Sequence, residues 1–173
     1  MQRSTQNNLL FSGGQAGIDL DQHKAAAAPV SASMTGDLEN VRLLLSRGAS
    51  PSEQAVSEAA TFGYADVVRA LISAGADTKL TDGSGINLLH WAAITDRPSL
   101  IPILAEAHVP INATDDHGFT PLMYAATIDF GDDDVLKALL IAGADKSIRN
   151  YENRTPLAQA KYYKHSRLEQ ALR

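Results

Sequence analysis

A nine-residue phrase in the middle of the chain returns near its C-terminal end. RALISAGAD ends at residue 77, KALLIAGAD ends at residue 145, and a weaker copy, PILAEAHVP, lies between them. Gly75, His108 and Gly143 hold equivalent places in these copies and are separated by nearly equal intervals. Self-similarity at a period of roughly 33 residues is typical of a stacked array, in which each unit contacts only its neighbours. The sequence therefore predicts a long surface rather than one closed core.

Pairs of short helical segments account for the period. Alanine pairs at 59–60, 92–93 and 125–126 recur at one constant interval, and each lies in a short segment of helical character. Each pair is followed by a turn and then by a second segment, such as ADVVRALISAG, whose apolar residues recur at the spacing of one buried helix face. This pattern predicts an all-α fold built from helix pairs.

The residues between these segments match the ends of helices. Gly75 and Gly143 follow the second helices, where a left-handed residue ends a helix at little cost. Thr120-Pro121 and Thr155-Pro156 place a hydroxyl cap before a proline at the first helical position. Asn87 is a third candidate cap. The stretches between successive pairs are rich in turn residues and suit hairpin-like fingers.

Taken together, these motifs resemble those of ankyrin-repeat proteins. DHGFTPLMYAA at 116–126 is close to the repeat consensus of that family, and INLLHWAA at 86–93, RTPLAQA at 154–160 and the two GAD phrases also match it. The resemblance covers about residues 25–173. It implies a solenoid of about five stacked helix pairs with hairpin-like fingers along one edge. The expected repeats span approximately residues 25–50, 51–81, 82–114, 115–149 and 150–173.

Two departures from the family pattern, and the N-terminal residues, lead to further expectations. The interval from Gly48 to Ala59 is shorter than the equivalent interval from Gly75 to Ala92, so the finger before the second repeat should be truncated. Pro102 would break a backbone hydrogen bond unless its helix begins at about residue 100, so that helix should be short or bent. Residues 1–24 are either a degenerate capping half-repeat or a flexible leader.

Composition and charge narrow the classes of function. The chain has no cysteine, which excludes disulfides and thiolate metal sites, and its net charge of −5 disfavours non-specific binding to nucleic acid. No apolar run approaches the ~20 residues of a membrane span. Residues 146–173 carry seven basic against two acidic residues. This basic end either steers a partner or is simply a solvated terminal face.

No pattern of catalytic or metal-ligating residues is found, and we expect neither an enzyme nor a cofactor. His90 is assigned a structural role, because in the ankyrin family this position hydrogen-bonds the capping residue and a neighbouring loop. The acidic run at 129–134 favours helix capping over a contact patch or a metal site. Structural roles are expected for His90, Thr120, Thr155, Gly75 and Gly143.

The resemblance places partner contacts on the inner helices and on the fingers. Trp91 and Tyr124 occupy one column, one repeat apart, and would either form a binding hot spot or only cover the inner helices. Ile86 and Phe119 would either contact the partner or pack finger against finger. The candidate partner-binding residues are Glu58, Phe62, Ile86, Trp91, Ile94, Asp116, His117, Phe119, Tyr124, Ile128, Tyr151 and Arg154.

The expected function is recognition of another protein by the concave face and fingers, as an adaptor or an inhibitor. The alternative is a regulatory repeat domain of a longer multidomain protein. We expect a monomer that binds neither nucleic acid nor membranes. If Met1 is the natural start, the absence of a secretory signal predicts a cytoplasmic location.

Overall fold

The computed structural model describes residues 29–173, of which residues 29–35 form a short helical segment at the N-terminal end of the array. The expectations for residues 1–24 lie outside the described residues. The helices that follow are α2 (Leu38–Ser46), α3 (Glu53–Phe62), α4 (Ala65–Ser73), α5 (Leu88–Ile94), α6 (Leu100–Glu106), α7 (Pro121–Thr127), α8 (Asp134–Ile141), α9 (Pro156–Tyr162) and α10 (Ser166–Leu172).

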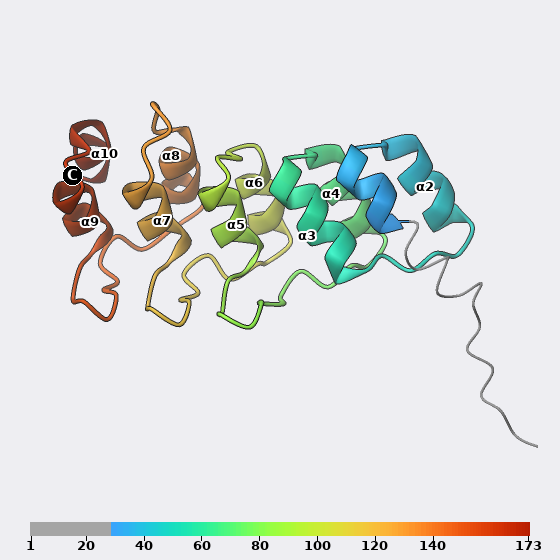
Figure 1. The fold of residues 1–173 in the computed structure, drawn as a ribbon, viewed down its shortest axis with the longest axis horizontal. Coiled ribbons are helices and arrows are strands. Elements are labelled where there is room, and N and C mark those ends of the chain that lie inside the picture. Colours follow the sequence, from blue (N-terminus) through green and yellow to red (C-terminus); the bar gives the residue numbers. More distant parts are fainter. Residues whose placement is uncertain (1–28) are drawn as a thin grey trace, which may run out of the picture.

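The helices form two rows that run the length of the molecule (Figure 1). In the inner row α3, α5, α7 and α9 contact one another in that order, and in the outer row α2, α4, α6, α8 and α10 do the same. Each inner helix also packs on the outer helix that follows it in the chain. The prediction of an all-α solenoid of stacked helix pairs is confirmed.

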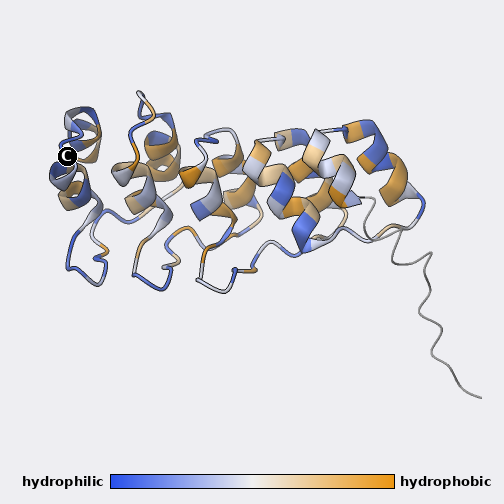
Figure 2. Ribbon diagram, viewed as in Figure 1, coloured by the Kyte–Doolittle hydropathy of each residue, from blue (hydrophilic) through white to orange (hydrophobic). Residues whose placement is uncertain are grey.

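Buried aliphatic residues from both rows form one core cluster, and Figure 2 shows hydrophobic segments on the helices of both rows. Leu71, Leu104 and Leu139 hold equivalent places in successive outer helices, and each is fully buried. The alanine pairs of the inner helices, at 59–60, 92–93 and 125–126, are also buried. Burying one leucine side chain stabilises a fold by roughly 1.5–3 kcal/mol, so this column of leucines is a principal source of stability.

Long connections join each outer helix to the next inner helix. We call residues 74–87, 107–120 and 142–155 the first, second and third finger, and they project along one edge of the stack (Figure 1). The connection between α2 and α3 spans only residues 47–52 and forms no finger. The deletion noted in the sequence therefore removes a finger at the N-terminal end of the array.

The residues at both ends of these helices form the local caps that their types suggest. The side chains of Thr120 and Thr155 accept hydrogen bonds from the N–H groups three residues on. Gly75 and Gly143 have φ of 93° and 95° after α4 and α8. His108 follows α6 at the equivalent place and also adopts a left-handed conformation, with φ 59°. Helix α6 begins at residue 100 and has seven residues, two fewer than outer helices α2 and α4.

Candidate partner-binding surface

The three fingers share one internal hydrogen-bond pattern. Asp82, Asp115 and Asn150 each use Oδ1 to accept two bonds, from the backbone N–H groups two and four residues further on, at 2.8–3.1 Å. The backbone N–H of each of these residues also donates to the carbonyl four residues on. A turn held by this set of hydrogen bonds is pre-ordered, so little conformational entropy is lost when a partner binds it.

Neighbouring fingers are joined to each other through the backbone. The N–H of Asp116 donates to the carbonyl of Ser84 at 3.0 Å, and the N–H of Tyr151 donates to the carbonyl of His117 at 3.2 Å. Gly118 lies at this seam, where an added Cβ would meet the backbone of Tyr151 at 3.0 Å. The fingers therefore form one continuous edge, from which side chains project in a fixed order.

His90 connects an inner helix to the second finger. Its Nδ1 accepts a hydrogen bond of 3.1 Å from the N–H of Asn87, and its Nε2 donates to the carbonyl of Phe119 at 3.0 Å. The ring is fully buried. Burial lowers the pKa of His90, although the Phe119 carbonyl and the charge of Asp115 partly oppose that shift. These contacts are the structural ones that the resemblance implies for this position.

Tyr124 connects helix α7 to the second finger in a similar way. Its hydroxyl donates a hydrogen bond of 2.7 Å to Oδ2 of Asp115, and its ring packs on those of Phe119 and His90. Burial and the bond to Asp115 raise the pKa of Tyr124. Burial alone would raise the pKa of Asp115, but bonds from Tyr124 and two backbone N–H groups hold it below its ordinary value.

A groove of about 310 Å³ lies between helix α3, the first finger and helix α5. Trp91 lines this groove and is half-buried. Trp91 and Tyr124 follow one another in the inner row, but within residues 29–173 their rings form no aromatic pair. The two residues therefore have different surroundings, since Trp91 borders an open groove and Tyr124 is bonded to a finger.

The remaining candidate residues differ in exposure. Phe62, Asp116, His117 and Tyr151 are exposed, the last to 78%. Ile86 is only 9% exposed and lines the groove from the first finger. The half-buried candidates are Glu58, Trp91, Ile94, Phe119, Tyr124, Ile128 and Arg154.

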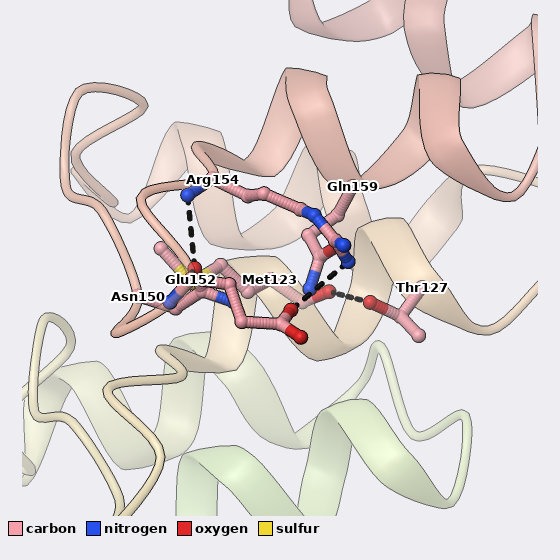
Figure 3. A network of polar contacts seen from close by, with 6 residues as sticks. All are labelled: Met123, Thr127, Asn150, Glu152, Arg154 and Gln159. Carbon is pink, nitrogen blue, oxygen red and sulfur yellow. Dashed lines mark hydrogen bonds and ion pairs between the residues drawn. The ribbon is translucent and has the colours of Figure 1, made fainter.

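The side chain of Arg154 contacts several residues at the C-terminal end of the surface (Figure 3). Its Nη1 lies 2.9 Å from a carboxylate oxygen of Glu152 and donates to Oε1 of Gln159 at 3.3 Å, while its guanidinium lies 3.9 Å from the ring centre of Tyr162. Gln159 follows Trp91 and Tyr124 in the inner column, but it is fully buried. At the basic C-terminal end, an arginine guanidinium therefore packs on an aromatic ring.

The acidic run in the turn before α8 is engaged in local contacts. Asp129 and Asp132 each accept a bond from the backbone N–H two residues on. Asp133 pairs with Lys137 at 2.7 Å. Among the described residues no three potential ligands are grouped closely enough to hold a metal ion.

Sequence reasoning missed several polar residues of this surface. Asp82 and Asp115, which shape the fingers, lie one full repeat apart, so the repeat period itself was an available signal for them. Glu53 and Asp77 line the groove beside Trp91. No sequence signal identified these two, because they meet only where the missing finger leaves helix α3 uncovered.

Comparisons with known proteins agree with this architecture. A family model described as ankyrin repeats, in three copies, matches residues 56–150. The chain belongs to the ankyrin-repeat family. Within residues 29–173, no helix combines the length and apolar character needed to cross a membrane.

Two curated relatives match over parts of their length. The palmitoyltransferase Hip14 of Drosophila melanogaster is 33% identical over 98 residues, which cover 56% of this chain and 15% of that protein. The ankyrin repeat and SAM domain-containing protein 6 of Rattus norvegicus is 38% identical over 71 residues, which cover 40% of this chain and 8% of that protein. The chain thus corresponds to a small part of each relative.

Proposed function

We propose that this chain recognises a partner protein through its inner helices and fingers, acting as an adaptor or as an inhibitor that masks its partner. Ankyrin repeats are generally modules of protein–protein interaction. The observation that carries the proposal is the backbone seam that joins Ser84 to Asp116 and His117 to Tyr151. It holds exposed finger side chains on a pre-ordered edge, which lowers the entropic cost of binding.

The exposed finger residues supply the contacts in this account. Tyr151 and His117 project from adjacent fingers, and the hydrogen bond of the seam uses only their backbone groups, while the edge of the Tyr151 ring lies over Gly118. Tyrosine is enriched among residues that dominate binding energy, because it offers a large rigid ring with one polar group. Ankyrin domains typically have no catalytic activity, and we propose none for this chain.

A second candidate function follows from the small share of each relative that the match covers. Because the matched segments make up 15% and 8% of two longer proteins, the same fold also suits a regulatory domain within a longer polypeptide. The surface would then act on another domain of that polypeptide. The mass of the native gene product separates this candidate from a free-standing adaptor.

Affinity capture with matched variants tests the proposal. His117→Ala combined with Tyr151→Ala removes exposed finger side chains, and Ile141→Ala is the control, because Ile141 is 88% exposed on outer helix α8. We expect the double variant to lose a protein that the control still captures, with helical circular dichroism unchanged in both. Equal capture by the two variants would contradict the assignment of the surface.

A further inference from the structure

The N-terminal edge of the first finger is open. Asp116 and Tyr151 each donate a backbone hydrogen bond to the preceding finger, and the equivalent residue of the first finger is Gly83. The N–H of Gly83 has no partner within residues 29–173, and the space that a Cβ there would enter is empty to 4 Å. The open edge results from the short 47–52 connection, which is too short to provide the preceding finger.

The groove beside this edge is lined with carboxylates. Glu53 and Glu58 contribute from helix α3, and Asp77 and Asp82 contribute from the first finger. These four are the only charged residues among those that line the groove, and no ion pair within the described residues involves them. Clustered carboxylates without cations give the groove a negative potential, which attracts positively charged groups.

Trp91 forms an aromatic wall of the same groove. A cation near an indole ring gains about 0.5–2 kcal/mol from the ring quadrupole, and tryptophan is the best of the aromatic residues in this respect. Aromatic and acidic groups thus line one groove, next to a free backbone donor. In an extended peptide with a basic side chain, the cation complements the carboxylates and the indole, and a backbone carbonyl accepts from the free N–H.

We infer that a basic, extended segment of a partner protein binds in place of the missing finger. A carbonyl of that segment accepts a hydrogen bond from the N–H of Gly83, in the manner of strand addition to a free edge. An arginine or lysine side chain of the segment enters the groove between the carboxylates and Trp91. This inference rests on the proposed function and specifies the chemistry of the partner.

The chain's own N-terminal residues are poorer occupants on grounds of charge. Residues 1–28 contain Arg3 and Lys24 but also Asp19 and Asp21, so their net charge is zero. A separate basic segment complements the groove better, and occupation by the chain's own segment is a distinct outcome of the experiment.

The single tryptophan of the chain makes the test direct, since Trp91 is the only tryptophan in the sequence and reports from inside the groove. The probes are the peptides acetyl-Gly-Ser-Arg-Ser-Arg-Ser-Gly-amide and its counterpart with glutamate for arginine. We expect the arginine peptide alone to change the fluorescence of Trp91 saturably, with an affinity that falls as salt is raised. No saturable change, or an equal change with both peptides, would overturn the inference.

Variants separate the side-chain and backbone parts of the inference. The double variant Glu58→Gln with Asp77→Asn should weaken binding of the arginine peptide about tenfold. The control Glu106→Gln, on outer helix α6, should leave that binding unchanged. Gly83→Pro removes the N–H at a turn position that proline tolerates, and Gly83→Ala keeps it in open space. We expect only the proline variant to weaken binding several-fold. Unchanged affinity in both the acidic and the proline variants would overturn the inference.

Two further outcomes identify competing accounts. If Arg3→Ala with Lys24→Ala changes the spectrum of Trp91 without any peptide, the chain's own N-terminal segment occupies the groove and a partner segment does not. If the arginine peptide fails while the finger variant His117→Ala with Tyr151→Ala still abolishes partner capture, this inference fails and the proposed function stands.

Discussion

The hydroxyl of Tyr124 lies 2.7 Å from Oδ2 of Asp115 and donates a hydrogen bond to it. The same carboxylate accepts two backbone bonds that shape the second finger, so this contact fixes the finger to helix α7. A family position assigned to partner contact therefore also carries an internal bond. Substitutions at Tyr124 therefore need to distinguish the effect of losing the hydroxyl from the effect of losing the ring.

Replacing Tyr124 by phenylalanine tests the internal bond. The variant keeps the ring and loses a donor to a largely buried carboxylate, so we expect the free energy of unfolding to fall by about 1–2 kcal/mol. Urea denaturation followed by circular dichroism measures the change. Tyr151→Phe is the control, because Tyr151 is 78% exposed. Equal stability of the two variants would show that the bond contributes nothing.

The buried neutral ring of His90 predicts a dependence of stability on pH. Burial holds its folded-state pKa below the ordinary value of 6.5, so the unfolded chain takes up a proton first as pH falls. The free energy of unfolding should therefore decrease as pH drops below about 6.5, and this contribution should be absent from His90→Gln. Parallel pH profiles for the two proteins would contradict the prediction.

Asp115 predicts a second loss of stability at lower pH. Its folded-state pKa lies below the ordinary value of 3.8, so its contribution is fully present above that pH and is lost as pH falls through the folded-state pKa. Asp115→Asn should flatten the stability profile in this acidic range, and it should not reduce the loss just below pH 6.5, because the charge of Asp115 raises the pKa of His90. Urea titrations at a series of pH values separate the two windows.

Some of these features were predictable because they depend on neighbouring residues alone. Local signals of helix ends are a threonine before a proline, an asparagine before an apolar run, and a glycine after an apolar run. Thr120, Asn87 and Gly75 are these residues, and in the structure they lie at helix ends. The bond from Tyr124 to Asp115 and the burial of Gln159 depend instead on how a finger lies against adjacent helices. No periodicity along the sequence determines those distances.

His108 shows the limit of residue-type reasoning at a helix end. The family usually has glycine there, and the structure gives His108 the same left-handed backbone, with φ 59°. We expect His108→Gly to raise the free energy of unfolding by up to about 1 kcal/mol, because glycine adopts this region without strain. Gly143→His, the reverse change at the equivalent place, should lower it. Thermal denaturation of both variants checks the opposite signs.

Gly118 should be less replaceable than Gly131, although both have a left-handed backbone. An alanine there combines φ 75° with a Cβ at 3.0 Å from the backbone N of Tyr151, so it strains one finger and displaces the next. Gly131→Ala meets only open space at φ 97°. We expect about 1 kcal/mol of destabilisation for Gly131→Ala and at least twice that for Gly118→Ala. Equal values would mean that the seam between the fingers is loose.

Hydrogen exchange of the free and partner-bound chain tests the central proposal most directly. If the fingers and inner helices form the binding surface, the partner should slow amide exchange at the finger positions around 83–85, 116–118 and 151–153, with outer helices α4, α6 and α8 unchanged. Slowing confined to the outer helices, with the fingers exchanging at their free rate, would contradict the account.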